Sequence, residues 1–543
     1  MLLRMPMKLN NLSVFFCLFF LAGCSSLKQP SEVFVVPDFS EEDVRKNEQR
    51  RIAELSGKNP VSAYWRSIIL NEPETVKEQE KNVFSLFEKA VEEKNYFEAE
   101  RLYVSLKNAG STLIDSSKKY EADLFAKSMD SVPGLSSKPG RLPQTLADCV
   151  NATVTIWVDK GIKIQNGYGY ADRVLGSGFF IDSRGYIVTN HHVISDLVDP
   201  KYEGYSRLFI KLASDQETRI PAKVIGYDSV LDIALLKCEI DPPFIFELGY
   251  SSGLSIGDRV NCIGTPIGLH GTVTSGIVSA VDRKLFTCGD VFQIDAAVNS
   301  GNSGGPCIDS RNRVQAIVFA GIMQYQGLNF AIPVEYLRQD LPFLYNGGKR
   351  ELGWLGGFGH TKKDGGKSTG LEVQYVMPGG VLSRTGVETG DIIMFLNGMR
   401  VNSLEQVQDV MRNFGPETIL SCVLYRNGEN IEKLFCIAPR PEQPGFDIYK
   451  SDLLSFSFVP IFGMELAHSS TISKRQYTVS KIIRGSAADE SGFSEYDPVY
   501  VSSVDFNEDN SAISVQLNTR KKKKGYLDIT MRIGSALDSP YYF

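Results

Sequence analysis

Residues 295–306 read Asp-Ala-Ala-Val-Asn-Ser-Gly-Asn-Ser-Gly-Gly-Pro, a glycine-rich loop that carries Ser303. The glycines allow the backbone to turn tightly and to come close to another peptide group. A serine in such a loop is a weak sign of function on its own. Two other stretches make it informative, because they supply a base and a carboxylate.

The first of these stretches, residues 185–193, reads Gly-Tyr-Ile-Val-Thr-Asn-His-His-Val, so that an apolar strand ends at two histidines. The second, residues 230–236, reads Val-Leu-Asp-Ile-Ala-Leu-Leu, and Asp232 is the one charge in an apolar run. A buried carboxylate is costly unless it has a partner. Each stretch alone has a structural explanation. Together they supply histidine, aspartate and serine in the chain order of a chymotrypsin-type triad.

The pattern around these stretches predicts a β-rich domain. Between the linker at residues 131–143 and about residue 344, short segments such as 208–212 alternate in polarity and are separated by glycine-rich turns. Many short strands with few helices are typical of an all-β barrel or sandwich.

Residues 41–129 have helical spacing instead, with breaks at 94–95 and 109–110. This region resembles a single tetratricopeptide unit, and a plain helical spacer is the alternative, because one unit cannot bury its own apolar face. After a break at 347–348, residues 350–440 predict strands with a helix at Ser403–Asn413. A proline-rich break at 439–444 then precedes a last α+β unit.

The first residues are typical of an export signal. Arg4 and Lys8 precede an apolar core, Leu12–Ala22, whose 11 residues are too few for a membrane-spanning helix. The stretch ends Leu-Ala-Gly-Cys at Cys24, which resembles the lipobox of bacterial lipoproteins, where the cysteine is acylated. An ordinary cleaved signal with a chance cysteine is the alternative. The lipoprotein interpretation predicts a lipid anchor on a membrane of the cell envelope, with the protein facing the periplasm.

Composition excludes several classes of function. The formal net charge is -6, without the strong basic footprint of a nucleic-acid binder. The 9 cysteines show no zinc-type spacing, so we expect no metal, and Cys422 and Cys436 are expected to be buried thiols, with a disulfide left open. No phosphate-binding loop occurs in the sequence, so neither a nucleotide nor another cofactor is expected.

Five motifs in the region from about residue 145 to 440 closely resemble the HtrA (Deg) family of serine proteases. They are Gly176–Asp182, Thr189–Val193, Leu231–Leu235, Gly271–Ala280 and Gly301–Pro306. The resemblance implies a double six-stranded β-barrel of chymotrypsin type followed by PDZ domains. The fold class expected is therefore multidomain, with an N-terminal α-helical region, an all-β protease domain and two α+β PDZ-like domains.

The resemblance also implies a role for each residue of the triad. Ser303 attacks the scissile carbonyl, His192 takes and returns the proton, and Asp232 orients the imidazole. His191 competes for the role of base, but the family places a small or amide residue there, which favours His192. Residues 327–333 match the segment that lines the S1 pocket, with Leu328 as its wall. The oxyanion hole implied consists of the backbone N–H groups of Gly301, Asn302 and Ser303.

A peptide-binding module is implied by residues 370–398, which resemble an HtrA-type PDZ domain. Its carboxylate-binding loop corresponds to Trp354, Leu355, Gly356 and Gly357, and the alternative for these residues is a plain glycine turn. Residues 479–503 echo the pattern without such a loop, which indicates a degenerate second domain. The basic run 520–524 predicts a solvated hairpin turn. Residues 541–543, Tyr-Tyr-Phe, are a candidate occupant of the PDZ groove of a neighbouring subunit.

The function expected is ATP-independent quality control, in which unfolded or misfolded envelope proteins are cleaved through an acyl-enzyme under the control of PDZ-bound C-terminal peptides. The alternative is a chaperone or scaffold with weak proteolysis. The family implies a homotrimer. The domains expected are a signal peptide at 1–23, a tether and helical region at 24–138, a trypsin-like protease domain at 139–346, a PDZ domain at 347–441 and a degenerate PDZ-like domain at 442–543.

Overall fold

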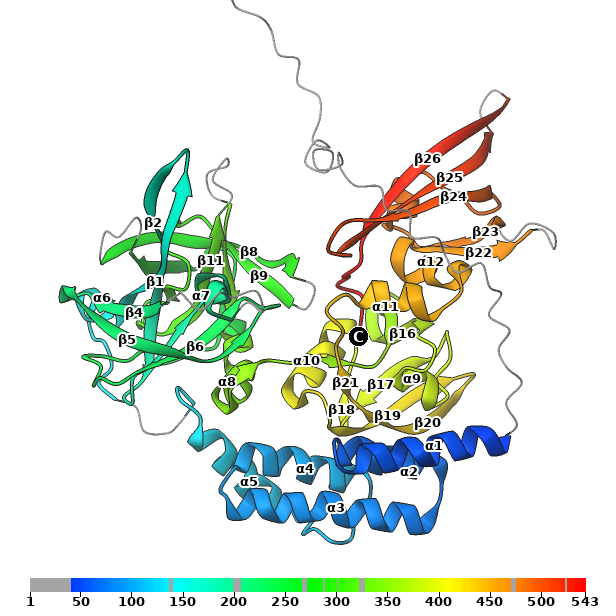
Figure 1. Cartoon of the computed structure of the whole chain (residues 1–543), viewed down its shortest axis with the longest axis horizontal. Coiled ribbons are helices and arrows are strands. Elements are labelled where there is room, and N and C mark those ends of the chain that lie inside the picture. Colours follow the sequence, from blue (N-terminus) through cyan, green and yellow to red (C-terminus); the bar gives the residue numbers. More distant parts are fainter. Residues whose placement is uncertain are drawn as a thin grey trace, which may run out of the picture.

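The structure, a computed structural model, describes residues 41–135, 140–198, 207–265, 271–286, 289–299, 301–321, 328–469, 475–522 and 525–543. The predicted signal peptide and Cys24 lie outside these ranges. Along the chain, a helical bundle is followed by two β-barrels and two further sheet domains (Figure 1). Within the described ranges, no helix is both long enough and apolar enough to cross a membrane.

The N-terminal helices break where the sequence predicts. Lys94 adopts a left-handed conformation with φ 59°, and Asn95 then caps the next helix by accepting the N–H of Glu98. The bundle consists of α1 (Glu41–Ser56), α2 (Pro60–Leu70), α3 (Pro73–Glu92), α4 (Tyr96–Asn108) and α5 (Lys118–Ser131).

The bundle packs against the domain that follows the barrels, along strands β19 (Ile419–Arg426) and β20 (Glu429–Cys436) (Figure 1). Trp65 Nε1 donates to the Leu434 carbonyl at 2.8 Å, and one buried apolar cluster is continuous across the contact. This shared core covers the apolar face that a lone helix pair leaves exposed, so the bundle is not a free spacer.

The first barrel is closed by a pairing between β5 and β6, and its strands are antiparallel. The residues just after the second barrel return to the first barrel, because β13 (Gly348–Lys349) joins β5 as a parallel strand. The six barrel strands are β1 (Thr153–Gln165), β2 (Tyr168–Asp182), β3 (Tyr186–Thr189), β4 (Arg207–Leu212), β5 (Asp215–Asp228) and β6 (Ile233–Cys238).

The second barrel is also closed, in the order β10-β11-β12-β9-β8-β7. The predicted double six-stranded architecture is therefore confirmed. Helix α6 (Leu146–Asn151) precedes the barrels, α7 (His191–Val198) follows β3, and α8 (Val334–Asn346) leaves the second barrel. Its strands are β7 (Arg259–Gly264), β8 (Thr272–Phe286), β9 (Gly289–Ile294), β10 (Pro306–Ile308), β11 (Val314–Gly321) and β12 (Asn329–Pro333).

The first α+β domain has the sheet order β15-β16-β17-β19-β20, with β18 paired to β17. The helix predicted at Ser403–Asn413 is confirmed as α10 (Leu404–Phe414), which Ser403 caps through the N–H of Gln406. Cys422 and Cys436 are buried and free, as predicted. The other elements are β14 (Gly353–Trp354), β15 (Gly357–Asp364), β16 (Lys367–Val376), β17 (Ile392–Leu396), β18 (Met399–Arg400), β21 (Ala438–Pro439) and α9 (Val381–Arg384).

The last domain is a five-stranded sheet in sequence order, β22 to β26. From β24 the chain passes through a turn at 507–511 directly into β25, so residues 498–522, all described, contain no counterpart of α10. The basic residues 520–522 lie at the end of β25, where that strand forms a hairpin with β26. The elements are α11 (Pro444–Ser451), α12 (Leu454–Phe462), β22 (Met464–His468), β23 (Gln476–Ile482), α13 (Ala487–Glu490), β24 (Pro498–Phe506), β25 (Ala512–Lys522) and β26 (Tyr526–Ala536).

Candidate active site

His192 and Asp232 are joined at neighbouring strand ends of the first barrel. Strand β3 pairs with β6, so the start of α7 lies beside the residue that precedes β6. His192 Nδ1 lies 2.7 Å from Asp232 Oδ2, and the His192 backbone N–H donates to Asp232 Oδ1 at 2.7 Å. The carboxylate thus holds both the ring and the backbone of one histidine. With Nδ1 engaged, Nε2 is the ring nitrogen that can accept a proton.

The turn that presents Asp232 is held by its own hydrogen bonds. Asp228 Oδ1 accepts the backbone N–H groups of Val230 at 2.7 Å and of Leu231 at 2.9 Å. Asn190 Nδ2 donates to the Asp232 carbonyl at 2.8 Å. These bonds hold Asp232 at φ 56°, a left-handed conformation that costs a non-glycine residue about 1–3 kcal/mol. Strain of this kind collects at sites of chemistry.

His191, the competing base, faces a different neighbour. Its ring stacks on Tyr227, with centroids 5.1 Å apart and planes 17° apart. Burial lowers the pKa of His191, which keeps this ring neutral near pH 7. Of the two histidines, His192 is the one whose ring bonds to the Asp232 carboxylate.

Ser303 lies on the loop that leads into β10 of the second barrel. A Cβ atom on the next residue, Gly304, would overlap the Thr189 hydroxyl and lie 3.0 Å from Asn190 N, so this loop touches the strand end that carries His192. Ser303 Oγ donates to the Phe319 carbonyl at 3.3 Å. Among the hydrogen bonds of the described residues, none joins Ser303 Oγ to the His192 ring.

The predicted oxyanion donors are only partly free in this conformation. Gly301 has φ 103°, and the Asn302 N–H donates to the Asn299 carbonyl at 3.0 Å. That N–H group is therefore occupied within the loop and is unavailable to a substrate oxygen until the loop turns. The oxyanion role of Asn302 stays a prediction.

Ser177 is a residue whose importance the sequence motifs did not reveal. Its N–H donates to the Ser303 carbonyl at 2.8 Å and its Oγ to the Gly301 carbonyl at 2.6 Å. Thr189 Oγ1 in turn donates to the Ser177 carbonyl at 2.7 Å. This fully buried serine links the nucleophile loop to the first barrel. Its position between Gly176 and Gly178 was the signal available in the sequence.

The predicted PDZ loop lies beside the end of the same chain. The Gly357 N–H donates to the Phe543 carbonyl and the Phe543 N–H to the Gly357 carbonyl, both at 3.0 Å, and Gly359 N–H donates to the Tyr541 carbonyl at 3.1 Å. Residues 541–543 thus extend the sheet at the free edge of β15. Trp354 packs edge-on against Tyr542 at 6.0 Å between centroids. The expected occupant is therefore present, supplied by this chain rather than by a neighbour.

Known families match the successive domains of the chain. Residues 176–317 match the trypsin-like peptidase domain, 349–420 the PDZ domain and 445–537 the TP0546 family PDZ domain. Residues 43–128 match a domain of unknown function (DUF8517).

Curated relatives match between about half and three fifths of this chain. A probable periplasmic serine endoprotease DegP-like from Bartonella henselae is 34% identical over 350 residues, which is 61% of this chain and 66% of that protein. A protein of the same description from Halomonas elongata is 34% identical over 283 residues, or 49% of this chain and 56% of that protein. The chain thus spans between about half and two thirds of the length of these relatives.

The chain belongs to the HtrA family. Solved structures that align with it include the HtrA-type protease AlgW with decapeptide, 26% identical and covering 55% of this chain and 99% of that chain at a TM-score of 0.44. The serine endoprotease from Yersinia pestis is 27% identical and covers 55% of this chain and 100% of that chain at a TM-score of 0.40.

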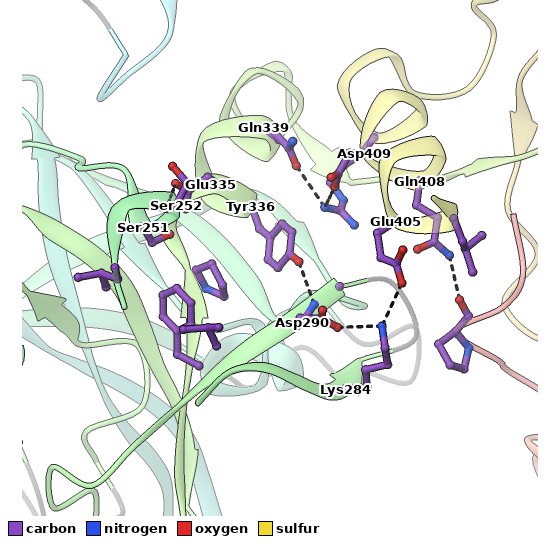
Figure 2. A pocket seen from close by; sticks show the side chains of 18 of the residues that line it. Ser251, Ser252, Lys284, Asp290, Glu335, Tyr336, Gln339, Glu405, Gln408 and Asp409 are labelled. Carbon is purple, nitrogen blue, oxygen red and sulfur yellow. Dashed lines mark hydrogen bonds and ion pairs between the residues drawn. The ribbon is translucent and has the colours of Figure 1, made fainter. Parts of the chain in front are cut away.

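In this HtrA-family chain a cavity of about 460 Å³ lies where the second barrel, α8, α10 and residues 540–541 meet. Figure 2 shows Lys284 between two carboxylates on one side of this cavity, Asp290 at 3.2 Å and Glu405 at 3.4 Å. The ion pairs join the β8–β9 hairpin to the PDZ helix α10. The cavity thus lies at the junction between the protease and PDZ domains.

Leu328, the predicted S1 wall, is half-buried and directly precedes β12. The next residue, Asn329, donates from its side chain to the Ala296 carbonyl at 2.8 Å. This bond ties the segment to residues that precede the Ser303 loop. Leu328 remains a predicted specificity residue on this basis.

Proposed function

We propose that the chain is a serine endopeptidase in which Ser303, His192 and Asp232 form the catalytic triad. The observation that carries the proposal is the pair of hydrogen bonds that the Asp232 carboxylate accepts, one from the ring Nδ1 and one from the backbone N–H of His192. A carboxylate in that position stabilises the imidazolium that forms when His192 takes the Ser303 proton. Ser303 Oγ then attacks the scissile carbonyl, the amine leaves with the proton from His192, and water hydrolyses the acyl-enzyme.

Gly301 and Ser303 N–H groups are assigned to the oxyanion hole, joined by Asn302 once the loop has turned. Loss of one such donor typically costs ~10²–10³ in rate. Leu328 is assigned to an apolar S1 pocket that takes small or medium aliphatic residues. This chemistry requires no nucleotide, so the reaction is ATP-independent.

The substrates proposed are unfolded or misfolded proteins of the cell envelope, with access controlled by peptides in the first PDZ groove. Two observations support this: the relatives are named periplasmic endoproteases, and the groove already accommodates an extended segment. An extended segment is what an unfolded chain offers to a sheet edge.

The test compares casein cleavage by the wild type and by Ser303→Ala. We expect a loss on the order of 10⁶ in kcat, because the serine, its base and its acid act as one unit. If the wild type cleaves no faster than the variant while both keep a misfolding client soluble, the chain is instead a chaperone or scaffold. Ser303 Oγ bonded to the Phe319 carbonyl is the observation that favours this alternative.

We further propose that acylation of Cys24 holds the protein on a membrane, facing the periplasm, and that the chain forms a homotrimer. Intact-mass measurement of exported protein should find a chain that begins at Cys24 and carries acyl groups. Light scattering of detergent-solubilised protein should give three times the monomer mass. An unacylated mature chain would rule out the anchor, and a monomer would rule out the trimer.

A further inference from the structure

The first PDZ groove is filled by side chains as well as backbone of residues 541–543. Phe543 is 2% exposed, and its ring lies directly over Gly357, where a Cβ atom would be 2.5 Å from Phe543 Cζ. Tyr541 packs on His360 with ring centroids 4.1 Å apart. These contacts bury the segment as a bound ligand would be buried.

Helix α10 holds the segment from the other side. Gln408 Nε2 donates to the Pro540 carbonyl at 3.0 Å and to the Tyr542 carbonyl at 2.9 Å. With β15 on one side and α10 on the other, residues 540–543 occupy the position of an added strand between sheet edge and helix.

The second PDZ domain delivers this segment to the first. Its last strand, β26, ends at Ala536, and the Leu537 N–H bonds to the Ser511 carbonyl at 2.8 Å. Arg440, between the two domains, pairs with Asp538. The tether between β26 and the groove is therefore a few residues long and is fixed at its start, which gives the segment a high effective concentration at the groove.

We propose that residues 541–543 are a built-in competitor for the first PDZ groove, held there by the second PDZ domain, so that an external peptide binds only by displacing them. This inference deepens the peptide-control part of the proposed function and rests on it. It also gives the second domain a role, although its sheet has no counterpart of α10 with which to form a groove of its own.

The test measures binding of a fluorescein-labelled synthetic peptide with the sequence of Ser539–Phe543 to the full chain carrying Ser303→Ala, so that no cleavage interferes. Deletion of residues 541–543 should tighten binding by about 10- to 100-fold, because a short tether supplies a millimolar-range internal competitor. Phe543→Asp should also tighten peptide binding, and it does so without shortening the chain. Tyr526→Ala, at a 75% exposed site on β26, is the matched control and should leave affinity unchanged.

Equal peptide affinity in the wild type and in both tail variants would overturn the proposal. A wild-type affinity that weakens only as protein concentration rises would also overturn it, because the segment would then sit in a second copy. Because the assay needs no hydrolysis, an inactive protease would defeat the proposed catalysis and leave this result standing.

A second observation concerns a buried ionic cluster behind the catalytic aspartate. Arg350, with no exposed side-chain surface, lies 2.8 Å from Asp340 and 3.9 Å from Asp228. Its backbone N–H donates to the Tyr227 carbonyl at 2.8 Å, and its Nη2 donates to the carbonyl of Arg412 on α10. The first residues of the PDZ linker are thereby fastened both to β5 and to the helix that lines the PDZ groove.

The geometry points to Arg350 as a positioning residue for Asp232. Asp228 Oδ2 faces Arg350, while Asp228 Oδ1 holds the two N–H groups of the turn that ends at Asp232. The guanidinium compensates the buried charge of Asp228 and so keeps that turn in its strained conformation. A buried carboxylate left without this partner would be neutralised or would move.

The test is the steady-state kinetics of a short chromogenic peptide on Arg350→Met and Asp228→Asn, with the active sites counted by titration with an organophosphonate. Both should lower kcat by about 10- to 100-fold with KM unchanged, since a small misplacement of the orienting carboxylate has this effect. Lys349→Ala is the matched control, because Lys349 directly precedes Arg350 and forms an exposed ion pair with Glu442.

A merely structural role would lower the fraction of active sites and leave kcat per active site unchanged, and that result in both variants would overturn the assignment. Arg350→Lys, which keeps a cation, should recover part of the rate. If the wild type itself is inactive, the proposed catalysis fails. An active wild type with unchanged kcat per active site in both variants overturns only the role of Arg350.

Discussion

The two barrels contribute unequal halves to the candidate active site. In the first barrel, Asp232 already makes both bonds that orient a base, to the Nδ1 and to the backbone N–H of His192. In the second barrel, Ser303 Oγ donates to the Phe319 carbonyl, and the Asn302 N–H donates within its own loop. The acid–base half is assembled and the nucleophile half is not.

The difference follows from how each half is built. The acid–base half lies between paired strands and a turn with internal hydrogen bonds, backed by buried charges. The nucleophile half is a loop in which Gly301 and Gly304 have φ 103° and 84°, conformations that glycine adopts at little cost. A donor group that is already oriented needs no reorganisation at the moment of reaction. On the proposed triad, we therefore expect activation to require movement of the Ser303 loop more than of His192 and Asp232.

The largest effect expected is that of His192→Ala, which should lower kcat on the order of 10⁶, as removal of one member of a triad does. His191→Ala should keep kcat within about threefold of the wild type. The His191 ring stacks on Tyr227, and it is the His192 ring that bonds to the Asp232 carboxylate. Casein cleavage measures both. A reversal of the two results would assign the base to His191.

Asp232→Asn should cost about 10⁴ in kcat with KM little changed. The amide keeps the size of the carboxylate but offers only one acceptor oxygen for the two N–H groups of His192. Steady-state kinetics on a short peptide measure the effect. Wild-type kcat in this variant would mean that the assembled half of the site does not serve catalysis.

For the nucleophile half, Gly301→Ala should lower kcat/KM by ~10²–10³, the range for a lost oxyanion donor. A side chain is strained at φ 103°, and it restricts the turn that frees the Asn302 N–H. The acylation rate of Ser303 by an organophosphonate reports the loop directly. Gly253→Ala is the matched control, because a Cβ there meets no atom within 4 Å. Equal acylation rates in both variants would show that the loop need not turn.

Local patterns predicted the elements that local forces build. The sequence predicted a helix at Ser403–Asn413, which is α10, and His192, Asp232 and Ser303 each lie in a short motif. The bond from Trp65 to Leu434 joins residues 369 positions apart, and no local pattern encodes it. The same holds for the return of β13 to β5 and for Phe543 over Gly357. The direction in which Ser303 Oγ points was also beyond prediction, because it depends on competing acceptors from separate strands.

The smallest effect expected concerns Asp340, in the ionic cluster behind the acid–base half. Burial, aided by the charge of Asp228 and opposed by Arg350, raises the pKa of Asp340 to about 8. In the unfolded chain this pKa is about 3.9. The folded state therefore binds the proton more tightly, and the resulting stabilisation is complete below about pH 4 and is lost as pH rises through 8. The melting temperature should fall between pH 5 and pH 8, by roughly 2–4 °C for each kcal/mol lost.

Asp340→Asn removes the titrating group, so its melting temperature should fall less over this pH range than that of the wild type. Asp309 is the matched control, since hydrogen bonds and the Arg313 guanidinium outweigh the opposing effect of burial and lower its pKa. Its stabilisation is present above about pH 4 and is lost only on acidification. Asp309→Asn should therefore lower the melting temperature equally at pH 5 and pH 8. Parallel curves of melting temperature against pH for the wild type and Asp340→Asn would mean that Arg350 keeps Asp340 ionised. The buried cluster behind the acid–base half would then be fully charged.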